Sequence, residues 1–348
     1  CADYSFNIHS IQHSSYSNAD FLYLLYKYSL ICQRLSDILK KIKVIFICES
    51  WDLNMGKTIS VLGDSISHGA NAPDIPNQSY IGIIKHRIAE KTGVYNYGFT
   101  SLQYMMLNDS GQYWEVHSLK SSGFAAFKDG RCINAYKLMA YEKNSYVDIS
   151  VNDRFNEAYI YYQSDKNFGS FEVYSAGRLV AEIDSSGESY CTKIYGPIDI
   201  SALDRADIKI KVVSENKPVL LSGMAYYNDK SKPVVNNYGL SGLCLGELSD
   251  DVIDAICNAD IVLFSIGHND SYFGDEKIFT EKINTAIESI KKYNAEVYVN
   301  DFCWFSNPDK NHFKLELKRL AKAVDAVYTD YAAELPGFLE HGLSDWAH

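Results

Sequence analysis

The chain has 348 residues, more than one hydrophobic core usually needs, so two domains are the default expectation. Hydrophobic residues make up 47% and charged residues 22%, which is ordinary for a soluble globular protein. The formal net charge is −11, and an acidic chain gains no counterion release on nucleic acid, so DNA and RNA are poor candidate partners.

The cysteines are scattered: none forms a C-x-x-C pair, and no Cys/His group has zinc-site spacing. Such thiols favour a reducing compartment, and we expect no metal and no cofactor. We also expect no membrane span, because the apolar run at residues 21–32 is too short and is broken by Lys27. It lacks the flanks of a signal peptide as well, which favours the cytoplasm. Export stays open, because the chain begins at Cys1 rather than Met.

Residues 1–55 carry no recognisable chemistry, although 20–43 have helix-like apolar spacing and 43–48 resemble a strand. From residue 56 the pattern is strand, helix, strand. Residues 58–62 form a short apolar run that ends at Gly63, which is typical of a buried parallel strand. The helix is expected to begin after Ser79 as its cap and to end at Gly93, and the second strand covers 94–97.

Residues 105–230 change character. Helical periodicity disappears, and short alternating runs rich in Tyr, Val and Ile follow one another between turn residues. This pattern predicts an antiparallel β-sandwich. The expected strands are 158–162, 170–174, 179–183, 208–213 and 219–223.

Residues 231–348 return to alternating strands and helices. The expected strands are 233–236, 261–266, 296–300 and 326–329, and the expected helices begin at Ser249, Glu276 and Asn311. Such alternation implies a parallel sheet covered on both faces. We therefore predict an α/β domain formed by 56–104 and 231–348, interrupted by an all-β insertion at 105–230 and preceded by an unassigned extension, 1–55.

Ser65 stands in a Gly-Asp-Ser motif directly after the expected strand 58–62. In open parallel sheets the reactive crevice lies beyond the carboxyl ends of strands, so a serine there is well placed to act as a nucleophile. It needs a histidine base. Asp345 and His348 have a spacing at which a carboxylate can orient an imidazole. Alternatively, Asp-Ser merely caps a helix and the D-x-x-H is a chance pair at a surface terminus.

Two further motifs follow predicted strands. Asn269, in Gly267-His268-Asn269-Asp270, carries an amide that can donate to a developing oxyanion. The run Asn-Tyr-Gly-Leu-Ser-Gly ending at Gly242 allows a backbone N–H to approach a ligand closely. Their structural alternatives are an Asn-Asp turn and a strand-to-helix turn.

Taken together, these four blocks resemble the SGNH (GDSL-like) hydrolase family, whose motifs read G-D-S, N-x-G/S-x-S-G, G-x-N-D and D-x-x-H. The resemblance implies a three-layer, flavodoxin-like α/β fold. It also implies Ser65 as nucleophile, His348 as its base with Asp345 orienting the imidazole, and an oxyanion site formed by the N–H groups of Ser65 and Gly242 with the Asn269 amide. A second run, Asn96-Tyr97-Gly98-Phe99-Thr100-Ser101, also resembles the second block and offers Gly98, but it lacks the block's final glycine, and the family spacing suits Gly242 better.

The family histidine is usually followed by a proline and a closing helix, whereas this sequence stops at His348. The insertion is similar to jelly-roll, carbohydrate-binding-module-like domains that accompany some SGNH carbohydrate esterases. Tyr159, Tyr161 and Tyr162 are candidates for stacking on sugar rings, and the alternative is that they fill the sandwich core.

The resemblance implies removal of a small acyl group, foremost acetyl, from a carbohydrate through an acyl-serine intermediate. The expected partner is an acylated carbohydrate or a small ester. A lipase-like or general acyl esterase, an O-acyltransferase and a non-catalytic glycan-binding protein are the alternatives.

Overall fold

The computed structural model describes residues 56–69, 75–102, 116–202, 206–301 and 311–330, all of which belong to the unit Asp52–His348. The helix and strand expected within 20–48 therefore lie outside the described residues. The predicted division of the chain at residues 55, 104 and 230 stays a prediction.

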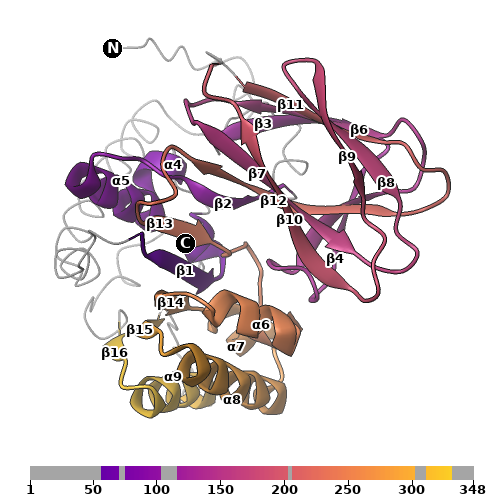
Figure 1. Ribbon diagram of the computed structural model, residues 1–348. Helices are drawn as coiled ribbons and strands as arrows, with labels where there is room; N and C mark the ends of the chain where they lie inside the picture. Colours follow the sequence, from indigo (N-terminus) through magenta and orange to yellow (C-terminus); the bar gives the residue numbers. More distant parts are fainter. Residues whose placement is uncertain (1–55, 70–74, 103–115, 203–205, 302–310, 331–348) are drawn as a thin grey trace, which may run out of the picture. The chain divides into compact units, whose positions relative to one another are not determined.

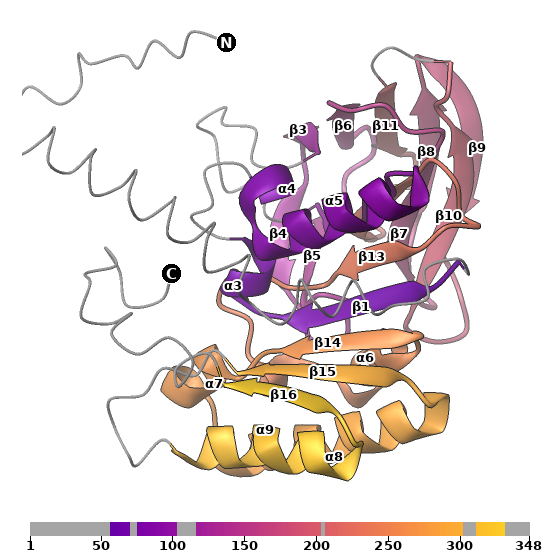
Figure 2. The ribbon, with the colours of Figure 1, turned by 90° about the vertical axis from the view of Figure 1, so that its left-hand side faces the viewer.

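A parallel sheet of five strands runs in the order β13-β1-β14-β15-β16, which Figure 2 shows from top to bottom. Its strands are β1 (Thr58–Gly63), β13 (Val234–Asn237), β14 (Ile261–Ser265), β15 (Glu296–Asp301) and β16 (Val327–Asp330). Every residue of β14 is buried, as expected for a strand covered on both faces. Because the strands are parallel, the loops that follow β13, β1 and β14 leave from one edge of the sheet.

The helices are α3 (Ser65–His68), α4 (Ile75–Gln78), α5 (Tyr80–Thr92), α6 (Asp250–Cys257), α7 (His268–Phe273), α8 (Glu276–Tyr293) and α9 (Asn311–Ala323). The predicted caps of α5 are confirmed: the Ser79 hydroxyl accepts from the Gly82 N–H, and Gly93 adopts a left-handed conformation with φ of 71°. The Asp275 carboxylate caps α8 in the same way. α8 packs against α9, and the two lie side by side in Figure 1.

The other strands form two antiparallel sheets. One runs β10-β7-β12-β5-β4 with β2 also paired to β12, and the other runs β3-β6-β11-β8-β9. Their strands are β2 (Gly98–Ser101), β3 (His117–Ser122), β4 (Ala125–Lys128), β5 (Tyr136–Ala140), β6 (Tyr146–Val151), β7 (Glu157–Ser164), β8 (Ser170–Ser175), β9 (Arg178–Asp184), β10 (Cys191–Asp199), β11 (Ala206–Val212) and β12 (Val219–Tyr227). Together they enclose a hydrophobic core of their own, to which Val147, Ile149 and Val151 contribute as alternate residues of β6.

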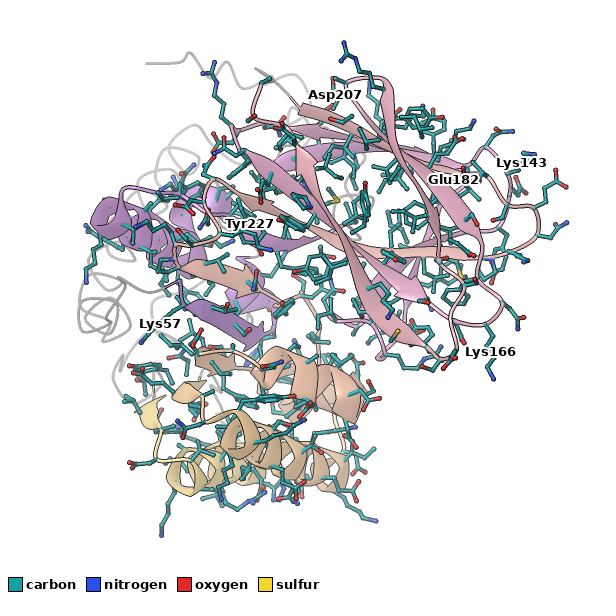
Figure 3. All side chains as sticks on the ribbon, in the orientation of Figure 1. Lys57, Lys143, Lys166, Glu182, Asp207 and Tyr227 are labelled. Carbon is teal, nitrogen blue, oxygen red and sulfur yellow. The ribbon has the colours of Figure 1, made fainter. Side chains whose placement is uncertain are left out.

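β7 and β12 are buried on both faces, so their alternating side chains enter two different cores. Ala158 and Ile160 belong to the core between the antiparallel sheets. Tyr159, Tyr161 and Tyr227 instead belong to a second core, which also holds residues of the parallel sheet and its helices. Figure 3 labels Tyr227, at the end of β12. One face of the six-stranded sheet therefore packs on the five-stranded antiparallel sheet, and its other face packs on the parallel sheet and its helices.

The predicted three-layer, flavodoxin-like α/β fold is wrong, because the described chain is mostly β. Of the sixteen strands in the described residues, eleven lie in antiparallel sheets. The strand expected at 94–97 as a second parallel strand is instead β2, which begins at Gly98 and pairs antiparallel with β12. Local sequence cannot show which partner a short strand pairs with, because pairing depends on segments more than a hundred residues away.

Gly98 marks the junction between the sheets and gives a test of this arrangement. Its φ is +72°, and a β-carbon there would lie 2.4 Å from the Val235 carbonyl oxygen. Gly98→Ala should therefore lower the free energy of unfolding by about 3 kcal/mol or more, through backbone strain and a clash with main-chain atoms.

Gly177, in the turn between β8 and β9, is the matched control. Its φ is +75°, but a β-carbon there meets nothing within 4 Å. Gly177→Ala should cost only about 1 kcal/mol, from the left-handed conformation alone. Equal losses for the two variants in urea unfolding would contradict the close approach of β2 to β13.

Candidate functional site

Three loops meet beyond the carboxyl ends of neighbouring parallel strands. The strand register pairs Val61 of β1 with Asn237 of β13, and Gly63 of β1 with Ser265 of β14. The loop after β1 carries Ser65, the loop after β13 carries Gly242, and the loop after β14 leads into α7 with Asn269. The sheet thus brings three of the four sequence blocks to one edge.

Ser65 is the first residue of the short helix α3, directly after β1, and it is buried. Asp64 caps this helix, because its carboxylate accepts from the Ile66 N–H at 3.0 Å. Gly69 ends it with φ of 89°. Asp64 is therefore a helix cap, as the structural alternative for the Gly-Asp-Ser motif expected. The cap of this helix is the Asp64 carboxylate and not the Ser65 hydroxyl.

Asn237 holds the β13 loop against the Ser65 helix. Its amide nitrogen donates to the Ser67 carbonyl at 2.7 Å, and its amide oxygen accepts from the Gly239 N–H at 3.0 Å. Gly239 is itself packed closely, since a β-carbon there would lie 2.8 Å from the Ser67 β-carbon. The Asn and first Gly of this block thus join two loops, which sequence analysis did not anticipate.

Gly242 and Gly98, the two candidate glycines for the second block, have very different surroundings. Gly242 is exposed, has φ of +77°, and a β-carbon there would meet nothing within 4 Å. Gly98 is enclosed between β2 and β13, where the neighbouring Phe99 N–H donates to the Asn236 side chain. The motif-like Asn96 is also structural, because its side chain bonds the main chain at Asn228, Asp229 and Pro233.

Asn269 and Asp270 tie α7 to the loop that carries Gly242. The Asn269 amide donates to the Leu243 carbonyl at 3.1 Å. The Asp270 carboxylate accepts from the N–H groups of Leu245 and Gly246, at 2.9 and 3.0 Å. One amide hydrogen of Asn269 is thereby engaged, and the side-chain amide carries a second.

Two of these connections carry buried carboxyl groups, Asp64 before α3 and Asp270 in α7. Burial raises the pKa of Asp64 to about 7, with a further contribution from the charge of Asp270. Burial likewise raises the pKa of Asp270 to about 6, although its two backbone hydrogen bonds oppose this. Within the described residues, Asp64 Oδ2 has no hydrogen-bond partner. An unpaired oxygen in a buried site favours the neutral, protonated carboxyl.

The remaining predicted site residues fall in two groups. Asp345 and His348 lie outside the described residues. Tyr159 and Tyr161 are each 8% exposed and line the core shared with the parallel-sheet part. Tyr162 packs edge to face on Phe171 against the sandwich core. The core-filling alternative thus describes these three rings.

No group of three or more potential metal ligands is found among the described residues. None of the described helices combines the length and apolar character that a membrane crossing requires. Cys132, Cys191, Cys244 and Cys257 have free thiols.

No family model and no curated protein matches the chain. Among solved structures, a peptidoglycan O-acetylesterase is similar over 89% of this chain and 88% of its own, with a TM-score of 0.59 and 12% identity. This is a likeness of fold. Because it covers 89% of the chain, it extends over both the parallel-sheet part and the β-rich part.

Two carbohydrate esterases match only in part. One is a family two carbohydrate esterase from Clostridium thermocellum, with a TM-score of 0.25 and 11% identity over 61% of this chain and 87% of its own. The other is a two-domain esterase active on acetylated mannans, with a TM-score of 0.30 and 11% identity over 38% of this chain and 36% of its own. These scores are too low to carry an argument.

The raised carboxyl pKa values predict how stability depends on pH. Because the folded protein binds the Asp64 and Asp270 protons more tightly than the unfolded chain, the free energy of unfolding should fall as pH rises from about 4 to 7. Each group contributes a slope of up to about 1.4 kcal/mol per pH unit. Asp64→Asn keeps an oxygen that can accept from the Ile66 N–H, and it removes one titrating group. The free energy of unfolding of the variant, relative to that of the wild type, should therefore increase as pH rises from about 4 to 7. Urea unfolding at several pH values measures the difference, and a difference that stays constant from pH 4 to 8 would refute the assignment.

Proposed function

We propose that this protein is a serine esterase that removes small acyl groups, foremost O-acetyl, from a carbohydrate. Ser65 is the nucleophile, and His348, oriented by Asp345, is its base. The Ser65 and Gly242 N–H groups and the Asn269 amide form the oxyanion site. The observation that carries the proposal is the meeting of the Ser65, Gly242 and Asn269 loops at one edge of the parallel sheet.

The proposed reaction has two steps. The Ser65 hydroxyl attacks the ester carbonyl carbon while His348 takes its proton, and that proton then goes to the departing sugar oxygen. Next, His348 takes a proton from water as the water attacks the acyl carbon; the bond from that carbon to Ser65 Oγ breaks, His348 returns the proton to Oγ, and the carboxylic acid is released. In both steps the oxyanion is met by donors that are already oriented, which lowers the barrier without reorganisation.

Two observations support the carbohydrate part of the proposal. One solved structure of similar fold is that of a peptidoglycan O-acetylesterase. In addition, Phe273 at the end of α7 is 82% exposed, and its ring lies 6.2 Å from that of Tyr272. These exposed rings, three and four residues after Asn269, offer an apolar face to a sugar ring whose acyl group reaches Ser65.

Ser65→Ala tests the nucleophile. It should lower the turnover of p-nitrophenyl acetate by a factor on the order of 10⁶, as loss of the nucleophile does in other serine hydrolases. Ser67→Ala, in the same helix, is the control. It removes a hydrogen bond to the Tyr80 hydroxyl at 2.6 Å, so it should lower stability and keep turnover in the folded protein. An alanine variant at Ser65 that retains a tenth of wild-type activity would exclude this serine.

Phe273→Ala tests the sugar contact. It should lower kcat/KM for an acetylated oligosaccharide roughly three- to tenfold, which is the usual contribution of one aromatic contact. The kcat/KM for p-nitrophenyl acetate should not change. Tyr141→Ala, at another exposed ring, should affect neither substrate. Equal loss on both substrates would assign Phe273 a structural role.

The same assays separate the competing functions. Rates that rise with the acyl chain length of p-nitrophenyl esters would favour a lipase-like enzyme. Appearance of the acetyl group on an added sugar would favour an acyltransferase. Glycan binding by wild-type protein that hydrolyses no ester would favour a non-catalytic binding protein.

A further inference from the structure

The β4–β5 hairpin of the six-stranded sheet reaches the segment that follows Gly242. This segment, residues 243–249, contains the short 3-10 helix Leu245–Glu247 and ends at the cap of α6. The hairpin turn, residues 129–135, joins β4 to β5. The two segments are more than a hundred residues apart in sequence.

Three features connect the hairpin to the segment. The Ser249 N–H donates to the Gly130 carbonyl at 2.8 Å. Lys128 forms an ion pair with Glu247. Ile133 and Ala135 are buried in the same core as Leu243, Leu245 and Leu248.

Gly130 allows the closest of these approaches. A β-carbon at Gly130 would lie 1.8 Å from the Glu247 carbonyl oxygen and 2.9 Å from its carbonyl carbon. Both are main-chain atoms, so no side-chain rotation relieves the clash. Any larger residue must move either the turn or the segment.

The turn also has ion pairs of its own. Asp129 accepts from Arg131 Nε and Nη2 at 3.0 and 2.9 Å, and it forms a second ion pair with Lys137. Although burial opposes ionisation, these hydrogen bonds hold the pKa of Asp129 well below its usual value. The charged carboxylate thereby fixes the turn from within.

On its other side the segment is held by α7. Asn269 bonds Leu243, and Asp270 bonds Leu245 and Gly246. Glu247 also accepts from the Cys244 N–H at 3.2 Å, so the partner of Lys128 is part of the segment's own hydrogen bonding. The loop carrying Gly242 is therefore held between α7 and the hairpin.

We propose that the β4–β5 hairpin is a positioning element of the esterase site, with Gly130 and Lys128 setting the place of the loop that carries the Gly242 N–H. This inference rests on the proposed function. It gives the β-rich part of the chain a role in catalysis on every ester, large or small, in addition to any sugar binding. A donor that must meet an oxyanion tolerates little displacement, since a shift of about 1 Å can cost 10²-fold in rate.

Gly130→Ala in the full chain is the direct test. We expect kcat for p-nitrophenyl acetate to fall at least tenfold, with KM within about twofold, because the displaced donor acts in the transition state. We also expect faster hydrogen exchange at the Leu245 and Gly246 amides. Lys128→Met adds no clashing atom, so it folds if Gly130→Ala does not. It should lower kcat severalfold, and Lys128→Arg should restore it.

Gly169→Ala is the matched control. Gly169 is another closely packed glycine of the sandwich, but its β-carbon would meet only side-chain atoms of Ser214 and Lys217, away from this loop. It should lower stability and leave kcat and the exchange of Leu245 and Gly246 unchanged. If Gly130→Ala and Lys128→Met behave like this control, the hairpin is structural only and the inference is wrong. A wild-type protein that hydrolyses no acyl ester would instead refute the proposed function. In that case amide exchange still tests the inference about the hairpin: unchanged exchange at Leu245 and Gly246 in Gly130→Ala would show that the hairpin does not position this segment.

Discussion

The parallel pairing of β1 with β13 and β14 is the constraint on which the candidate site depends. Ser65, Gly242 and Asn269 lie far apart in the chain, and each follows its strand by only a few residues. Since parallel strands present their carboxyl ends at one edge, pairing the three strands is enough to bring the three loops together. The pairs Val61 with Asn237 and Gly63 with Ser265 set how far along the edge each loop begins.

The six-stranded antiparallel sheet is part of the same packing. Tyr161 on β7 lies edge to face on Phe99 of β2, with ring centroids 5.0 Å apart, and Phe99 also contacts Tyr238, at 4.8 Å. Tyr238 stands in the loop between β13 and Gly242. Tyr161, one of the candidates for sugar stacking, thus packs through Phe99 against the first residue of this loop. The β4–β5 hairpin reaches the same loop farther along the chain.

The electrostatics of the site follow from this burial. The packing that brings the loops together also removes Asp64 and Asp270 from water, so both carboxyl groups favour their protonated forms more than an exposed aspartate does. A neutral Asp64 beside Ser65 places less negative charge at the proposed oxyanion site than an ionised one would. Stability and the charge of the site are thus linked through the same two residues.

Sequence alone determined the local features of this protein. Caps such as Ser79 and Asp275, the left-handed Gly93, and the extents of β1, β14 and α8 follow from residues within a few positions of one another. The blocks at Ser65, Gly242 and Asn269 were recognisable for the same reason. Tertiary structure alone decided that β2 pairs with β12 and that Tyr159 and Tyr161 enter a shared core. It also decided that Gly130 touches Glu247. These features depend on contacts between segments tens to hundreds of residues apart, whose partners no local pattern of hydrophobicity or turn residues specifies.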